Sequence, residues 1–225
     1  MPEWGCMARK KFDLSLIPPS PDLSFELSLW QRGIIHVAGI DEAGRGALAG
    51  PVAVGVVTLP ANLPDQVRKL PGVRDSKQLT PRERENAVVL IKQIAFTWAV
   101  GFADAAEIDQ LGVARATRLA AIRAIDQLDF IPQHLLIDYI KLRESDLPQT
   151  SLVKGDQRSL SIACASILAK TTRDELMVRL SERFPIYGFA RHKGYGTAIH
   201  LAAIRVCGAC PIHRVSFAPF SPKVN

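Results

Sequence analysis

The chain of 225 residues lacks a long hydrophobic run. No window of about 18 uncharged apolar residues exists, so no membrane-spanning helix is expected. The segment from Met1 to Ser20 has scattered charges and the pair Pro18-Pro19 instead of the apolar stretch of a signal peptide. Internal repeats and low-complexity tracts are also missing. These absences argue against a membrane, secreted or fibrous protein and predict a cytoplasmic globular one.

Cysteine is scarce, with four residues at positions 6, 164, 207 and 210. In a chain without a secretion signal, reduced thiols are expected in place of a disulfide framework. The sequence Cys207-Gly-Ala-Cys210, followed by His213, invites a zinc or redox interpretation. Only this pair has ligand spacing, and no strand-plus-helix context makes it thioredoxin-like. We therefore predict no structural metal at this position.

The composition that is present fits one sizeable core. Hydrophobic residues make up 48% of the chain, which allows a single core with a small appendage. Lys and Arg together number 28 against 22 acidic residues, a net charge of +6. Such a balance favours polyanionic partners such as nucleic acid or an anionic membrane, although many basic proteins simply have solvated lysines.

Three parts of the chain differ in pattern. Residues 1–32 form a Pro/Ser-rich extension, residues 33–184 a dense alternation of strands and helices, and residues 185–225 a loop and helical region. We expect the first part to be partly mobile. Strands are predicted at 34–40, 51–59, 94–102, 135–137 and 150–153, and helices at 81–93, 105–128, 160–184 and 197–207. Three strands followed by alternating helices and strands predict an α/β protein with a mixed sheet covered by helices.

Carboxylates stand where two apolar strands are expected to end. Asp41 and Glu42 follow the run 34–40, and Asp138 follows the run 135–137. Burying a carboxylate there is costly, and neighbouring parallel strands bring such ends together. A hard divalent cation, Mg²⁺ or Mn²⁺, would relieve the repulsion between them. The alternative, that each acid caps a strand end or pairs with Arg or Lys, stays open.

Asp174 is a candidate fourth member of this set. It follows Lys170 by one helical turn in a predicted helix whose first half, 162–169, is rich in small residues. Small side chains would let this helix approach the sheet closely and bring Asp174 to the other acids. An ordinary Lys170–Asp174 surface pair is an equally good interpretation.

Two glycine-rich loops could meet a phosphate backbone. Gly44-Arg45-Gly46 directly follows the first acids, and glycines let backbone amides approach a sugar hydroxyl or a phosphate. A tight strand-to-strand turn is the alternative. The second loop, 187–197, combines glycines, basic residues and aromatics, a mixture that suits nucleic acid, although Tyr187 and Phe189 are expected to pack on the core.

In combination, these motifs resemble ribonuclease HII over residues 35–217. The match consists of the segments 39–46, 75–79, 135–138, 154–156, 161–174, 187–189, 192–197 and 213–217. Each segment alone is a weak signal, and their order makes the whole specific. Two departures are Tyr139, where the family often has Gly, and Cys164 in place of a common Ala. The first suggests a differently placed loop after Asp138.

The resemblance implies a ribonuclease H-like fold, with a mixed five-stranded sheet flanked by helices and a C-terminal helical extension. It implies an endonuclease that hydrolyses the RNA strand of RNA–DNA hybrids. It also implies incision 5′ of single ribonucleotides in duplex DNA, leaving 5′-phosphate and 3′-hydroxyl ends, as in ribonucleotide excision during DNA replication and repair. A monomer without a membrane partner is expected; protein partners are unknown.

The resemblance also implies site residues. The catalytic residues and the ligands of Mn²⁺ or Mg²⁺ would be Asp41, Glu42, Asp138 and Asp174. The substrate-binding residues would be Gly44, Arg45 and Gly46 at the ribose 2′-hydroxyl, Tyr195 stacked at the RNA–DNA junction, and Lys77 and Lys193 in the polar loops. Two rival functions share part of this pattern: another nuclease of the same fold, such as a junction resolvase, and a non-catalytic hybrid-binding module.

Overall fold

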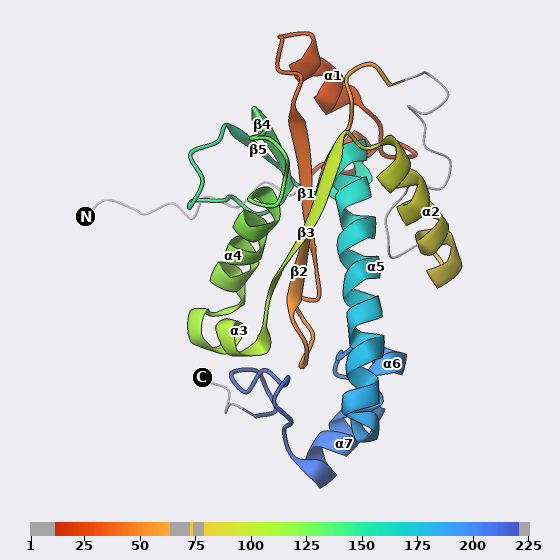
Figure 1. Ribbon diagram of the computed structural model, residues 1–225, viewed down its shortest axis with the longest axis vertical. Coiled ribbons are helices and arrows are strands. Elements are labelled where there is room, and N and C mark those ends of the chain that lie inside the picture. Colours follow the sequence, from red (N-terminus) through yellow and green to blue (C-terminus); the bar gives the residue numbers. More distant parts are fainter. Residues whose placement is uncertain (1–11, 64–72, 74–78, 221–225) are drawn as a thin grey trace, which may run out of the picture.

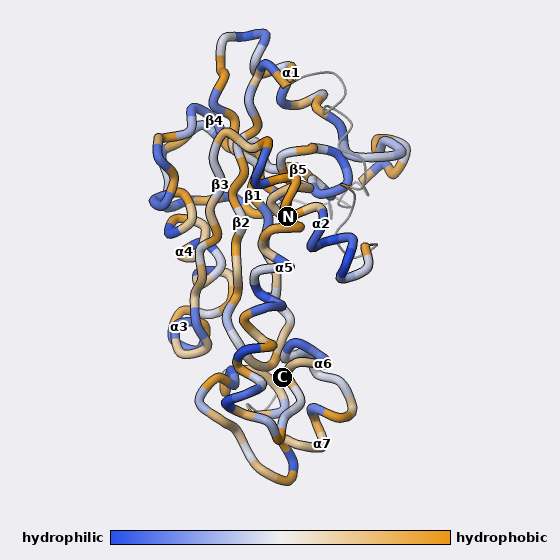
Figure 2. Tube along the Cα trace, turned by 45° about the vertical axis from the view of Figure 1, so that its right-hand side comes forward, coloured by the Kyte–Doolittle hydropathy of each residue, from blue (hydrophilic) through white to orange (hydrophobic). Residues whose placement is uncertain are grey.

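A computed structural model describes residues 12–63, 73 and 79–220. A central sheet is covered by α3 and α4 on one face and by α5 and α2 on the other (Figure 1). The strands are β1 (Val37–Ala43), β2 (Val52–Thr58), β3 (Thr97–Ala103), β4 (His134–Asp138) and β5 (Gln149–Leu152). Hydrophobic residues run along the central strands, whereas the outer helix α2 (Pro81–Ile94) is mostly hydrophilic (Figure 2). The predicted α/β class is confirmed.

The strands form one mixed sheet in the order β3-β2-β1-β4-β5. β2 pairs antiparallel with β1 and β3, whereas β4 lies parallel to β1 and β5. The predicted five-stranded mixed sheet is therefore confirmed. β1 continues through Asp41 and Glu42 to Ala43. These two acids are therefore among the last residues of the strand and do not follow it.

The long helix α5 (Leu160–Arg183) lies unusually close to the sheet. A Cβ at Gly39 would come within 2.2 Å of the Ser161 backbone, and one at Gly55 within 2.3 Å of the Ala165 carbonyl oxygen. Glycines on the strands and small residues on the helix therefore make this contact possible. The close approach predicted from the small residues is confirmed, and it brings the polar side chains of α5 to the end of β1.

The single helix predicted at 105–128 was wrong. Two helices form instead, α3 (Ala105–Leu111) and α4 (Val113–Ile125). Gly112 separates them with φ of 76°, a left-handed conformation that suits glycine. The apolar periodicity continues across the break because both helices bury their apolar faces on the same side of the sheet, so the periodicity alone could not locate it.

The helix α1 and the C-terminal helices α6 and α7 lie at opposite ends of the sheet (Figure 1). The helix α1 (Ser24–Trp30), which was not predicted, follows the short 3-10 turn η1 (Leu14–Leu16) and buries Leu23, Glu26 and Leu29. At the other end, η3 (Pro185–Tyr187), α6 (Phe189–His192) and α7 (Ala198–Cys207) follow α5. None of the helices in the described part of the chain is both long and apolar enough to cross a membrane.

Candidate active site

Three of the predicted acids line one cleft at the end of β1 and β4. Ile40 pairs with Ile137 in the parallel register, which places Asp41 beside Asp138 one residue farther along. The cleft has a volume of about 500 Å³ and is lined by Asp41, Glu42, Ala43, Gly44, Arg45, Arg84, Asp138, Ser166, Lys170 and Tyr195. The sheet register therefore brings together side chains that are 97 residues apart in sequence.

The negative charge of Asp41 is strongly disfavoured in this cleft. Its pKa is raised well above the ordinary aspartate value, first by burial and then by the negative charges of Glu42 and Asp138. A hydrogen bond from Ser166 on α5 acts in the opposite direction. A carboxylate buried beside other carboxylates favours the neutral form unless a cation compensates it.

Asp156 is a fourth acid near Asp41 that the sequence analysis did not place in the site. It lies in the 3-10 turn η2 (Gly155–Gln157) after β5, is buried, and its charge also raises the pKa of Asp41. The neighbouring Gly155 amide donates a 2.6 Å hydrogen bond to Asp138 Oδ1. The sequence signal was the segment Lys154-Gly155-Asp156, one of the segments that carry the resemblance, which assigned Asp156 no role in the site.

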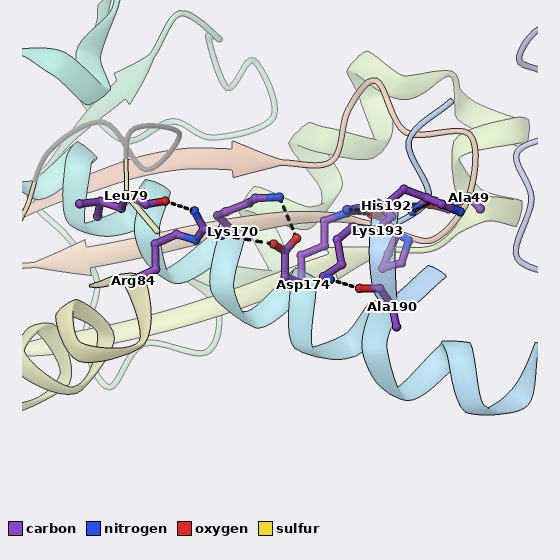
Figure 3. Close-up of polar contacts among 11 residues, drawn as sticks. Ala49, Leu79, Arg84, Lys170, Asp174, Ala190, His192 and Lys193 are labelled. Atoms are coloured by element: carbon purple, nitrogen blue, oxygen red, sulfur yellow. Dashed lines mark hydrogen bonds and ion pairs between the residues drawn. The ribbon is translucent and has the colours of Figure 1, made fainter. Parts of the chain in front are cut away.

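Asp174 lies at the margin of this cleft, between two cations. Lys170 Nζ donates to its Oδ1 at 2.8 Å, and Arg84 lies 3.8 Å from its Oδ2 (Figure 3). It lines an adjoining cavity of about 420 Å³ that shares Lys170, Arg84 and Tyr195 with the first. The Lys170–Asp174 pair expected as an alternative is thus present, at the border of the cleft and not on an open surface.

The donor set fits a hard divalent cation better than zinc. Among the described residues that line the cleft are carboxylates and a serine, and none of them is a cysteine or a histidine. Within the described residues, however, no three potential ligand side chains are already gathered closely enough to hold an ion. The charge stress on Asp41 is the feature that a bound cation would relieve.

The first glycine-rich loop borders the acids. Gly44 and Arg45 line the cleft, and Arg45 Nη1 makes a 3.0 Å ion pair with Glu42. Gly44 has φ of 87°, and a Cβ there would collide with Arg173 of α5. Around Gly46 no atom lies within 4 Å of an added Cβ, so this side of the loop is open. The loop is a tight turn, as expected, and it is also open toward the cleft.

The second glycine-rich loop brings Tyr195 to the same cleft. The Tyr195 ring is 37% exposed, and Lys170 Nζ and Arg173 Cζ each lie 5.5 Å from its centre. Tyr187 and Phe189 are buried, as predicted. Lys193 lines the adjoining cavity, and its ammonium donates to the Ala190 carbonyl (Figure 3). Lys77 lies outside the described residues.

A chain of hydrogen bonds through two buried histidines holds the backbone of Tyr195 in place. The Cys210 amide donates to His213 Nδ1, so His213 carries its proton on Nε2, which lies 3.0 Å from His200 Nε2. His200 must then carry its proton on Nδ1 and donate it to the Tyr195 carbonyl at 3.0 Å. Each step requires a neutral imidazole, and burial lowers the pKa of both histidines, that of His213 to about 4.

Lowering the pH should therefore destabilise the fold around His200 and His213. The unfolded chain protonates His213 near the ordinary value of 6.5, whereas the folded chain does so only near 4. The unfolded state binds more protons in that window, so stability is present above pH 6.5 and is lost as the pH falls toward 4. In melting curves from pH 7 to pH 4, we expect a smaller acid-induced fall in Tm for His213→Gln than for the wild type.

The control is His36→Gln, which changes a partly exposed histidine at the opposite end of β1. This variant should retain the acid-induced fall in Tm. An identical pH dependence in His213→Gln and the wild type would show that the buried imidazole does not take part. The same cluster uses the backbone amide of Cys210 and not its thiol.

Known proteins resemble this chain over most of its length. The model of the ribonuclease HII family matches residues 38–220. The ribonuclease HII of Desulfitobacterium hafniense (strain Y51) is 50% identical over 200 residues, covering 89% of this chain and 75% of the relative. That of Dehalococcoides mccartyi (strain ATCC BAA-2266 / KCTC 15142 / 195) is 49% identical over 199 residues, covering 88% and 93%.

Solved structures agree. The ribonuclease H2 of Pyrococcus horikoshii OT3 superposes with a TM-score of 0.66 at 26% identity, covering 82% of this chain and 94% of that one. The ribonuclease HII of Archaeoglobus fulgidus, solved in complex with PCNA, gives a TM-score of 0.67 at 27% identity, covering 80% and 92%. These matches confirm the predicted ribonuclease H-like fold and the predicted resemblance. The chain therefore belongs to the ribonuclease HII family, which consists of endonucleases that degrade the RNA of RNA–DNA hybrids.

Proposed function

We propose that this enzyme also incises duplex DNA on the 5′ side of a single embedded ribonucleotide, leaving 5′-phosphate and 3′-hydroxyl ends. The observation that carries the proposal is that Gly44, Arg45 and Tyr195 line the same cleft as Asp41. A single ribonucleotide offers only one 2′-hydroxyl, the group that distinguishes RNA from DNA. Recognition must therefore lie within reach of the scissile phosphate, and this arrangement meets that requirement. Such an activity would serve ribonucleotide excision in DNA replication and repair.

In this proposal the acidic residues bind metal, and the basic residues around them bind substrate. Asp41, Glu42, Asp138 and Asp174 would hold divalent metal, Mn²⁺ or Mg²⁺, which supplies an activated water and stabilises the leaving 3′ oxygen. One ribonuclease H relative, the Bst-RNase HIII, was solved with Mn²⁺. Asp156 adds negative charge behind Asp41, and Ser166 orients that carboxylate.

The basic residues would hold the substrate. Arg45 pairs with Glu42 before substrate is bound and can turn to a phosphate, to which a guanidinium binds in a fork. Lys193 borders the cavity next to the cleft, where a phosphate of the same backbone could bind. The Gly44, Arg45 and Gly46 amides would read the 2′-hydroxyl, and Tyr195 would stack on the sugar or base at the junction. Lys77 is proposed as a further phosphate contact.

Cleavage of a duplex with one embedded ribonucleotide tests the proposal. With Mn²⁺ or Mg²⁺ present, we expect one cut on the 5′ side of the ribonucleotide, and no cut in the all-DNA duplex of the same sequence. End-group analysis should give a 3′-hydroxyl upstream and a 5′-phosphate downstream. Cleavage of long hybrids without cleavage of the single-ribonucleotide duplex would restrict the activity to hybrids.

The same assay separates the two rival functions. A junction resolvase of this fold would cut branched DNA and ignore the ribonucleotide. A non-catalytic binding module would bind the hybrid and leave it intact, although carboxylates beside the backbone would repel the duplex it binds. Either result would contradict the proposed activity.

A further inference from the structure

The backbone of the Gly44-Arg45-Gly46 loop is hydrogen-bonded to a buried arginine that is far away in sequence. Arg214 is fully buried, and its guanidinium donates three hydrogen bonds to backbone carbonyls. Nη2 donates to Gly44 at 2.8 Å, Nη1 to Arg45 at 2.8 Å and Nε to Gly50 at 3.0 Å. The three bonds hold both ends of the turn between β1 and β2 in one planar fork.

These bonds fix the orientation of two amides. A trans peptide is planar, so its carbonyl and the following N–H point in opposite directions. Because the Gly44 and Arg45 carbonyls face Arg214, the N–H groups of Arg45 and Gly46 must face away from it. Among the described residues neither of these amides has a hydrogen-bond partner. They are therefore two oriented donors on the side of the loop that faces away from Arg214, and Arg45 lines the cleft that holds Asp41.

The burial of Arg214 is expensive, which argues that its geometry serves a purpose. Among the described residues no carboxylate is hydrogen-bonded to it, and burial and the positive charge of Arg173 lower its pKa to about 9. Asp109 of α3 fixes the chain just after it by accepting the amides of Val215 and Ser216 at 2.9 Å each. A lysine keeps the charge, but its compact ammonium lacks the planar fork that spans three carbonyls.

We propose that Arg214 is a positioning residue for ribose recognition: it orients the Arg45 and Gly46 amides toward the 2′-hydroxyl and so sets the preference for RNA over DNA. Arg214 touches neither substrate nor metal in this role and acts only through the loop. The inference rests on the proposed reading of the 2′-hydroxyl by this loop. It goes beyond it by assigning the orientation of the amides to a residue of the C-terminal segment.

The test is equilibrium binding without cleavage, measured in EDTA. Two labelled duplexes differ by one 2′-hydroxyl, and the ratio of their Kd values reports ribose preference. We expect Arg214→Lys to lower the wild-type ratio about tenfold, or to abolish a smaller one, since misorienting one or two hydrogen bonds costs about that factor. Affinity for the all-DNA duplex should stay within about twofold, because the charge and the phosphate contacts remain.

A control variant of similarly lowered stability separates the positioning of the loop amides from a general loss of stability. Leu59→Ala removes a fully buried side chain just after β2, at the end of the sheet away from the loop, and should lower Tm without changing the ratio. An unchanged ratio in Arg214→Lys, or an equal loss of affinity for both duplexes, would overturn the inference. So would an equal fall of the ratio in Leu59→Ala.

Two further outcomes keep the test decisive. A wild-type protein with no ribose preference would contradict the proposed recognition by the loop itself, whatever Arg214 does. If Arg214→Lys does not fold, Asp109→Ala releases the two amides after Arg214 while leaving the guanidinium in place. That variant should also lower the ratio, and an unchanged ratio would overturn the inference.

Discussion

Replacing Asp138 by asparagine is expected to remove nearly all cleavage while leaving the protein folded and at least as stable. Asp138 lies beside Asp41, and its charge raises the pKa of that buried carboxyl. Asparagine keeps an oxygen that can accept the Gly155 amide, which now bonds Asp138 Oδ1 at 2.6 Å. The change therefore removes a charge and a proposed metal ligand while keeping an acceptor for the Gly155 amide.

The two effects have opposite signs. Metal-assisted catalysis supplies several kcal/mol of transition-state stabilisation, so cleavage should fall on the order of a thousandfold. One charge fewer in a mutually repelling group should keep Tm equal or raise it. Cleavage is measured with saturating Mn²⁺ on a hybrid, together with a melting curve for each protein.

Asp146→Asn is the matched control, since it makes the same chemical change at an exposed position away from the cleft. This variant should cleave like the wild type. Substantial activity in Asp138→Asn at saturating Mn²⁺ would contradict the assignment of Asp138 as a ligand. A large drop in its Tm would instead show that the carboxylate is needed for the fold.

The sequence predicted the elements that carry strong local signals. Thr80 caps α2 with a reciprocal capping box and Pro81 begins the helix, as its sequence indicates. The helix α5 ends at Arg183, before Pro185, close to the predicted position. The break at Gly112 was missed because a single glycine is often tolerated inside a helical pattern. The helix α1 was missed because seven residues give little periodicity.

The sequence indicated where the acids of β1 and β4 would meet, but not every residue around them. Acids after two apolar runs pointed to the edge where β1 and β4 end, and the parallel register placed them together. No local pattern could show that Asp156 is buried near Asp41, because that depends on where η2 returns after β5. The Gly44-Arg45-Gly46 motif could be recognised in the sequence. Its hydrogen bonds with Arg214 could not, because Arg214 is 169 residues from Arg45 and 170 from Gly44.

Tyr139 illustrates a departure that the structure explains. It follows Asp138 with φ of 57°, in the left-handed region that non-glycine residues seldom adopt. A family preference for glycine at this position, as the resemblance implied, has a direct backbone reason. The side chain itself is 71% exposed, so the tyrosine fits without crowding the core. The backbone at Tyr139 therefore has a conformation that glycine adopts readily, and the expected difference in the placement of the loop after Asp138 stays a prediction.

Replacing Tyr195 by alanine is expected to slow cleavage at a single embedded ribonucleotide by about tenfold or more. Stacking of a base or sugar on an aromatic ring contributes roughly 1–3 kcal/mol by alanine substitution, and about 1.4 kcal/mol corresponds to a factor of ten. The ring is partly exposed and borders both cavities, so it can meet a substrate. A long hybrid should suffer less, because neighbouring sugars share the recognition.

Tyr195→Phe separates the ring from its hydroxyl. Phenylalanine keeps the stacking face and the cation contacts with Lys170 and Arg173, so this variant should retain most activity. The His200 bond reaches the Tyr195 backbone and survives in both variants, so the loop should stay in place and Tm should change little. Full activity in Tyr195→Ala would end the stacking hypothesis. A fall in Tm with a proportional loss on both substrates would show that the ring acts in packing, because lost stacking at the junction reduces only the single-ribonucleotide reaction strongly.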